Sequence, residues 1–288
     1  MHLPLVQPQL ELLAPVRLPA LAARWTVDVL GALPPAERLS TCDACVKLPK
    51  PGEPPQKTHF NPATKCCTYL PVLHNFQVGA LLDDPEVSAA GRASVERRID
   101  VGEGVTPTGL IGTAAYYSQY GDEAFGKDEA LLCPHYLSEE GGRCGVWQHR
   151  NATCSTWYCR TDRGAASFAF WRHGLAGLLR TAEDVVAEWA VFALGADGGA
   201  EGQWGPWADR RAFYRASARL ADRCSWEQVV QLGGGKLQTM IDQARRTYGE
   251  LLDAPIDPDY DPHQTRVGAR DAAAELDPER PEPGAIAP

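Results

Sequence analysis

The spacing of the cysteines constrains this chain more than any other feature. Eight of its nine cysteines lie between residues 42 and 159, whereas Cys224 stands apart. The chain has 288 residues, which is enough to bury a hydrophobic core, so disulfides are not needed to stabilise an undersized fold. We therefore expect the clustered thiols to have a chemical role. They are Cys42, Cys45, Cys66, Cys67, Cys133, Cys144, Cys154 and Cys159.

These thiols have the chemistry of metal ligands. Thiolates are soft donors that bind zinc, copper(I) and iron–sulfur clusters. The C-x2-C pair Cys42 and Cys45 suits tetrahedral zinc. The adjacent Cys66 and Cys67 suit one small ion less well, because neighbouring side chains diverge by about 100° in a helix and about 180° in a strand. Because eight thiols also exceed the four positions of one zinc ion, the pattern favours a polynuclear centre, with iron–sulfur slightly ahead of paired zinc.

The spacing leaves the identity of the centre open. Four cysteines suffice for a [4Fe–4S] cluster, but neither ferredoxin run, C-x2-C-x2-C or C-x4-C-x2-C, occurs here. A redox thiol array and an exported, disulfide-bonded protein are alternatives, and eight paired cysteines would allow 105 connectivities. An iron–sulfur redox or methyl-transfer enzyme is another. The motifs G-x-S-x-G, H-E-x-x-H and G-x-G-x-x-G are absent, and the sequence defines no catalytic residue.

The N-terminus and the charge distribution indicate a cytoplasmic protein. The first 25 residues are apolar but interrupted by prolines and charges, and no lysine or arginine precedes their first apolar stretch, so a signal peptide is not expected. No run approaches the roughly 18 apolar residues of a membrane helix. Thiols stay reduced in the cytoplasm, which agrees with metal binding. The net charge is −9 with no basic block, so we expect neither nucleic acid nor a membrane as a partner.

Four histidines lie inside the cysteine-rich part and could each replace a thiolate. With eight cysteines at hand, none of them is required. The best placed is His135, which follows Cys133 and Pro134; the others are His59, His74 and His149.

Composition divides the chain into four segments. Residues 1–40 form a proline-punctuated lead-in, and residues 41–160 form an irregular, cysteine-rich metal-binding module. Residues 165–252 carry apolar stripes at helical spacing and predict a small bundle of three or four helices. Residues 253–288 are acidic and rich in proline, and we expect them to be disordered. The predicted fold class is mainly α with this metal module and a C-terminal helical bundle.

Capping residues predict where the helices begin. Asp84 with Pro85 predicts a helix to about Ile99. Thr181, three residues before Asp184, and Ser225, three before Gln228, predict two further starts. Two apolar stripes support the bundle, one at Val185, Trp189 and Phe192 and the other at Leu237, Met240, Ile241, Ala244, Tyr248 and Leu251.

The segment GRCGVWQHRNATCSTWYC resembles the closing part of the CxxCxxCC cysteine-cluster family, the zinc- or iron-chelating proteins of bacteria. Over residues 41–160 the resemblance implies metal chelation by all eight clustered cysteines. In the opening part, residues 46–65 separate the C-x2-C pair from the CC pair, whereas the family keeps them within a few residues. Flagellin lysine N-methylases carry a similar cluster beside helices, which makes an enzyme the alternative. The closing match runs through Cys144, Trp147, Arg150, Cys154, Trp157 and Cys159; Cys133 matches the preceding cysteine, and Cys42, Cys45, Cys66 and Cys67 match the opening ones.

Overall fold

The chain is mainly helical, as its sequence predicts. The computed structural model describes residues 18–35, 37, 45–54, 56–121, 124–197 and 203–257. The predictions for residues 1–17, for Cys42 and for residues 258–288 lie outside them. The α-helices are α2 (Ala20–Leu30), α3 (Asn75–Asp83), α4 (Ala89–Val101), α5 (Ala114–Gln119), α6 (Ala152–Ser155), α7 (Gly164–Ala169), α8 (Ala176–Ala193), α9 (Arg210–Arg223) and α10 (Trp226–Asp253).

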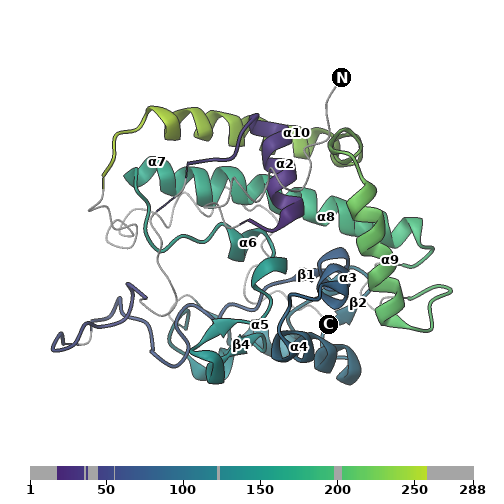
Figure 1. The fold of residues 1–288 in the computed structure, drawn as a ribbon, viewed down its shortest axis with the longest axis horizontal. Coiled ribbons are helices and arrows are strands. Elements are labelled where there is room, and N and C mark those ends of the chain that lie inside the picture. The colour runs from purple at the N-terminus through teal and green to yellow at the C-terminus, as the bar shows by residue number, and fades with distance from the viewer. Residues whose placement is uncertain are drawn as a thin grey trace, which may run out of the picture.

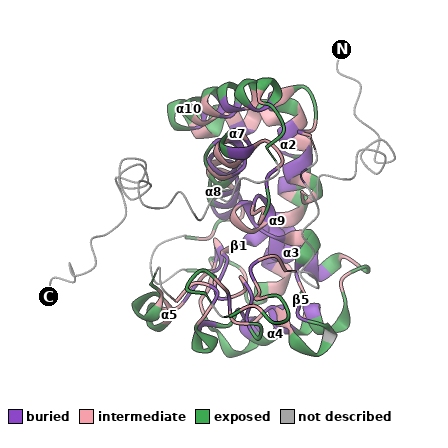
Figure 2. Cartoon of the chain, turned by 90° about the vertical axis from the view of Figure 1, so that its left-hand side faces the viewer, coloured by how far each residue is buried: buried purple, intermediate pink, exposed green. Residues whose placement is uncertain are grey.

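The helices form two tiers (Figure 1). Helices α2, α7, α8 and α10 lie together in the upper tier, and α4, α5 and the short strands lie in the lower one, with α6 between them. Helices α3 and α9 pack against each other beside this junction. Figure 2 shows buried residues on the inward faces of the upper helices and exposed residues on the outer faces of α10 and α4.

The lower tier is held by very short strands. An antiparallel sheet has the order β1-β3-β2, with Leu73 opposite Leu110 and Val105 opposite Leu110 on the other side. A separate hairpin pairs Tyr136 with Cys144. Each strand has only two residues, so turns and side-chain contacts shape this region more than the ladders do. The strands are β1 (Leu73–His74), β2 (Val105–Thr106), β3 (Gly109–Leu110), β4 (Tyr136–Leu137) and β5 (Arg143–Cys144).

The apolar stripe predicted in the last helix is confirmed. Its residues lie in the core that α10 shares with α2 and α8, where Trp25 and Trp171 are among the largest buried side chains. Gly234 has φ 53° and ψ −143°, so the glycine run kinks α10 there. Ser225 caps the helix by accepting a hydrogen bond from the Gln228 backbone N–H, as predicted.

Two other predicted helix starts are wrong. Asp84 ends α3, and Ser88 caps α4 by accepting the Gly91 backbone N–H. Thr181 lies inside α8, where its hydroxyl donates to the Gly177 carbonyl. The capping pattern misled there because α7, the π-helical turn Phe170–Leu175 and α8 follow one another without a break, so no helix start needs a cap.

Only part of the stripe predicted in α8 lies toward the core, where Val185 and Trp189 are partly buried and pack against it. Phe192 is 84% exposed, whereas Val186 and Ala190 are buried. The buried face continues from Leu179 through Ala182 and Val186, at the spacing of a single helix face.

Helices α3 and α9 pack at backbone contact distance. A Cβ atom added to Gly79 would lie 1.9 Å from the Tyr214 carbonyl oxygen. Around this contact Val78, Leu81 and Phe213 form a second core. Only glycine at position 79 allows this approach.

We predict that Gly79→Ala destabilises the protein by roughly 3 kcal/mol or more, because overpacking at a backbone contact must push the helices apart. The matched control is Gly249→Ala in α10, where an added Cβ meets nothing within 4 Å. That change should stabilise the protein by about 1 kcal/mol, as alanine favours helix. Urea unfolding measures both. Equal effects of the two variants would contradict the close packing.

Candidate metal centre

Hydrogen bonds bring distant cysteine-bearing segments of the chain side by side. The Cys133 backbone N–H donates to the Cys67 carbonyl at 2.7 Å. Cys144 lies on β5 and pairs with Tyr136, three residues after Cys133. Seven of the eight predicted ligands belong to the described residues, and no disulfide joins any two of the cysteines in that part of the chain.

The thiols of this region affect one another electrostatically. Burial, with contributions from the neighbouring Cys144 and Cys66, raises the pKa of Cys154 to about 12. Burial also raises the pKa of Cys133, again with contributions from Cys144 and Cys154. Burial and the neighbouring Cys66 also raise the pKa of Cys45. Without a metal ion, thiols in these surroundings stay protonated at neutral pH.

The adjacent cysteines Cys66 and Cys67 interact with each other, although the sequence led us to expect divergent side chains. The pKa of Cys66 lies well above its ordinary value, first because its thiol hydrogen-bonds the Cys67 side chain and second because of burial. The expectation assumed a helix or a strand, but this segment is a series of turns. Lys65, directly before the pair, has φ 52°, the only positive φ of a non-glycine residue among those described. The two side chains are therefore close enough to interact.

The other two described cysteines lie near the upper tier and after α6. Cys224 caps the end of α9 in the core of the upper tier, where its thiol donates to the Ser225 carbonyl at 3.8 Å. This agrees with its assignment as a small buried side chain. Cys159 follows α6 and is half-buried.

Buried cations surround the thiols. Arg98 is 2% exposed, Arg150 is 6% exposed and Lys65 is 9% exposed. Arg98 lowers the pKa of Cys133, and Arg150 lowers the pKa of Cys154. Each cation favours the thiolate form of its neighbour.

The hydrogen bonds of these cations run mainly to backbone carbonyls. Arg98 donates to the Ile111 carbonyl at 2.5 Å and the Glu103 carbonyl at 3.4 Å, and its Nε is buried without a hydrogen-bond partner. Lys65 Nζ donates to the Gly141 and Gly142 carbonyls at 3.2 and 3.3 Å. Carbonyls satisfy the N–H groups, but they do not neutralise a buried charge.

Arg150 is held in place from three sides. Its Nε donates to the Trp147 carbonyl at 2.8 Å, and its guanidinium lies 3.4 Å from the centroid of the Trp147 ring. Its Nη1 donates to the Cys154 carbonyl at 3.3 Å. Stacking and hydrogen bonding together fix the positive charge beside Cys154.

The histidines of this region have partners of their own. Burial and Arg98 lower the pKa of His135 to about 3, so the imidazole is neutral. Arg98 Nη1 faces its Nε2 at 3.5 Å, and the Ser94 hydroxyl faces its Nδ1 at 2.9 Å. His149 Nε2 lies 2.7 Å from Asp84 Oδ2. His59 Nδ1 accepts the Gln56 backbone N–H at 3.1 Å.

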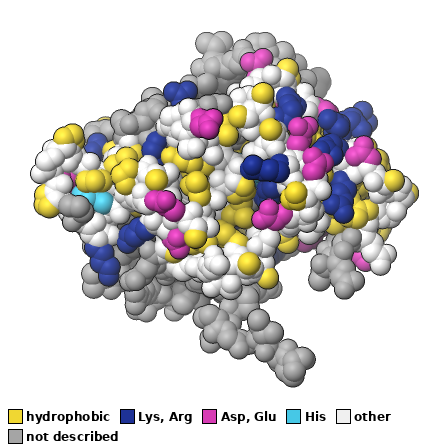
Figure 3. Space-filling view, turned by 90° about the horizontal axis from the view of Figure 1, so that it is seen from below, with side chains coloured by type: hydrophobic (Ala, Val, Ile, Leu, Met, Phe, Trp, Pro, Cys, Tyr) yellow, Lys and Arg dark blue, Asp and Glu magenta, His cyan; other side chains and the backbone are white. Residues whose placement is uncertain are grey.

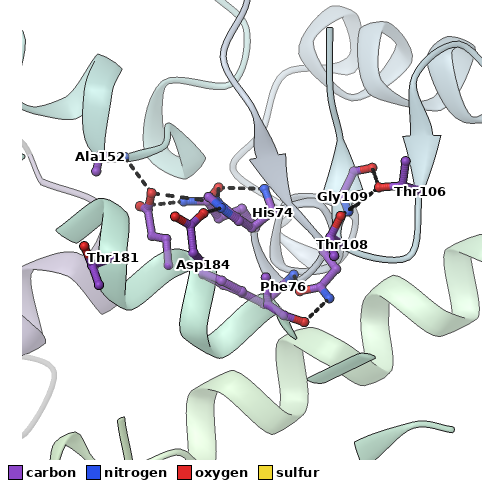
Figure 4. A network of polar contacts seen from close by, with 12 residues as sticks. His74, Phe76, Thr106, Thr108, Gly109, Ala152, Thr181 and Asp184 are labelled. Carbon is purple, nitrogen blue, oxygen red and sulfur yellow. Dashed lines mark hydrogen bonds and ion pairs between the residues drawn. The ribbon is translucent and has the colours of Figure 1, made fainter. Parts of the chain in front are cut away.

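A buried polar network that the sequence did not reveal borders the cysteines (Figure 4). His74 Nε2 contacts Asp184 Oδ1 at 2.9 Å, and its Nδ1 lies 3.8 Å from Glu183 Oε2. Glu183 is 2% exposed and accepts hydrogen bonds from Gln77 Nε2 at 2.9 Å and the Ala152 backbone N–H at 3.0 Å. Burial raises the pKa of Glu183 to about 7.

One sequence signal points to Glu183. It stands four residues after Leu179 and three before Val186, on the buried face of α8. A charged side chain on an apolar helix face marks a buried polar contact.

The pKa of His74 is raised because its contacts with Asp184 and Glu183 outweigh its burial.

Neither the arrangement of the described side chains nor the comparison with known proteins assigns a metal or a family to the chain. Among the described residues, no group of three or more histidine, cysteine, aspartate or glutamate side chains is arranged to hold a metal ion. No family model, no curated protein and no solved structure matches the chain.

None of the helices in the described ranges combines the length and apolarity needed to cross a bilayer. Seen from below, the surface mixes hydrophobic, basic and acidic side chains, and neither sign of charge covers a continuous area of this face (Figure 3).

We predict that Glu183 makes stability fall as pH rises. Its pKa moves from 4.5 to about 7 on folding, so between these values the folded state binds more protons than the unfolded state. The free energy of unfolding should then decrease by roughly 2–3 kcal/mol as pH rises from about 4.5 to 7. His74, whose pKa is also raised, adds a loss of the same sign above about pH 6.5.

The measurement is urea unfolding of the wild type and of Glu183→Gln across this pH range. The free energy of unfolding of the variant should change less with pH, because in this network only the titration of His74 still contributes to the change. Glu188→Gln is the matched control, since Glu188 is exposed on the same helix. Parallel profiles for the wild type and Glu183→Gln would contradict the prediction.

Proposed function

We propose that the clustered cysteines hold a metal–thiolate centre and that the protein is a metal-binding protein of the cysteine-cluster kind, working in the cytoplasm of a bacterium. An iron–sulfur centre is preferred over paired zinc sites. The eight cysteines named from the sequence are the proposed ligands, with Cys66, Cys67, Cys133, Cys144 and Cys154 as the central set. The irregular lower tier would be the metal-binding module, and the upper tier its supporting bundle.

The observation that carries this proposal is the burial of cations beside thiols. A buried charge without a counter-charge costs several kcal/mol, even when its N–H groups are hydrogen-bonded. Neither Arg98 nor Lys65 forms a salt bridge within the described parts of the chain, although the exposed carboxylate of Glu103 raises the pKa of Arg98. Neutral thiols cannot balance these charges, but thiolates can, and thiols this deeply buried become thiolates when they bind a metal.

The residues present fit such a group. The thiols supply soft ligands, and when bound the metal would supply either a structural cross-link or a site for electron transfer. Arg98 and Arg150 would balance the negative charge of the thiolates, and the Trp147 ring holds Arg150 in place. The interaction between the Cys66 and Cys67 side chains is compatible with both reaching one centre, and the preference for a polynuclear site rests on the number of thiols.

We predict that protein purified without oxygen contains iron and sulfide, is brown and absorbs broadly near about 400 nm, as thiolate-bound iron–sulfur centres do. Elemental analysis and the visible spectrum measure this. A colourless protein with about two zinc ions per chain would instead indicate paired tetrahedral zinc sites. A metal-free protein with no titratable thiols would end the proposal in favour of disulfides.

Substitution should separate ligands from packing residues. Cys144→Ser or Cys154→Ser should lose both the metal and soluble protein, because metal binding and folding share free energy at such sites. Cys224→Ser should change neither, since Cys224 lies in the core of the upper tier. Loss of metal in Cys224→Ser alone would show that the ligand set is wrong.

The buried cation gives an independent test. Arg98→Met keeps an unbranched side chain but removes the charge beside Cys133, and we expect the metal to be bound about 10–100-fold more weakly, as for other outer-shell changes. The matched control is Arg215→Met, which removes an arginine that pairs with Asp83 at the surface. Equal metal affinity in the two variants would contradict the charge-balance argument.

A further inference from the structure

The segment that carries Cys154 has little stability of its own. Helix α6 has four residues, too few for a stable isolated helix. Its geometry must therefore come from contacts with the rest of the chain. Asn151 caps it by accepting the Cys154 backbone N–H at 3.0 Å.

The contacts that fix this segment come from α8 and α3. Glu183 Oε2 accepts the Ala152 backbone N–H at 3.0 Å, and Gln77 Nε2 reaches the Arg150 carbonyl at 3.5 Å. Gln77 also donates to Glu183 at 2.9 Å, so the two side chains hold each other in position. The His74 backbone N–H fixes Gln77 further by donating to its Oε1 at 2.9 Å.

We propose that Glu183 is a positioning residue for Cys154: its carboxylate anchors the start of α6 and so directs the Cys154 thiol toward Cys66 and Cys144. This inference rests on the proposed function, in which Cys154 is a ligand. Glu183 acts through the Ala152 backbone N–H, two residues before the cysteine.

The sign of the charge supports a positional role over an electrostatic one. A carboxylate near Cys154 disfavours the thiolate, and Glu183 does raise the pKa of Cys154, whereas Arg150 lowers it. Placing a carboxylate in the core also costs free energy unless its hydrogen bonds are made. Glu183 is therefore explained by the hydrogen bonds it accepts. An amide in its place has one acceptor oxygen, which can keep the bond from the Ala152 backbone N–H but gives up the bond from Gln77.

The experiment measures thiol reactivity residue by residue in metal-free, reduced protein. Iodoacetamide labelling followed by peptide mass spectrometry gives the alkylation rate of Cys154, with Cys224 as the internal reference for global unfolding. Glu183→Leu removes the acceptor, and Glu183→Asp shortens the side chain so that the carboxylate withdraws from Ala152. Glu183→Gln keeps an oxygen acceptor at full length.

We expect Cys154 to react at least tenfold faster in Glu183→Leu and several-fold faster in Glu183→Asp, and to stay within about threefold of the wild type in Glu183→Gln. Glu188→Leu, at an exposed position of the same helix, should match the wild type. Cys224 should keep its rate in all variants. If Glu183→Leu unfolds and exposes Cys224, the comparison of Glu183→Asp with Glu183→Gln decides.

Unchanged Cys154 rates in Glu183→Leu and Glu183→Asp, with Cys224 protected, would overturn the positioning role. So would equal acceleration in Glu183→Asp and Glu183→Gln. Metal content of the wild type is measured separately. Absence of metal ends the proposed function while the order of alkylation rates still tests the anchor, so the two failures can be told apart.

Discussion

The polar side chains at the start of α3 bind the two tiers of the molecule to each other. Asn75 Nδ2 donates to the Pro107 carbonyl at 3.0 Å in the lower tier and to the Ala187 carbonyl at 2.9 Å in α8. His74 and Gln77 extend this junction to Asp184 and Glu183. Since Asn75 is fully buried, each of these bonds replaces contacts with water that folding removes. The position of the cysteines relative to the bundle depends on this junction.

A polar junction fixes orientation in a way that apolar packing alone does not. Apolar surfaces can slide and repack, but a buried donor left without its acceptor costs about 1–3 kcal/mol. The network at α3 joins the loop before β3, helix α8 and the start of α6 through directional bonds. Helix α9 supports it from the side through the close contact at Gly79. The lower tier can therefore keep a defined geometry although its strands have only two residues each.

Local patterns predicted much of the helical tier but little of the candidate centre. The stripe in α10 and the Ser225 cap follow from residues three or four apart, so the sequence was sufficient there. The grouping of the cysteines was expected from their chemistry. The contacts of Glu183 with Gln77, 106 residues away, and of Arg98 with His135, 37 residues away, depend on the tertiary fold. The left-handed backbone at Lys65, directly before Cys66 and Cys67, is a conformation that the lysine side chain does not signal.

The charges of the lower tier connect the proposed centre to folding. In the metal-free state Cys133 and Cys154 are protonated by burial, while Arg98 keeps its charge beside them. Metal binding would exchange thiol protons for thiolate charge and so convert an unbalanced site into a balanced one. The upper tier has a separate hydrophobic core and does not need this compensation. Of the two tiers, the lower one should therefore gain most of its stability from the metal, and the junction at α3 would transmit that gain to the bundle through its hydrogen bonds and through the packing of Phe76 in the upper core.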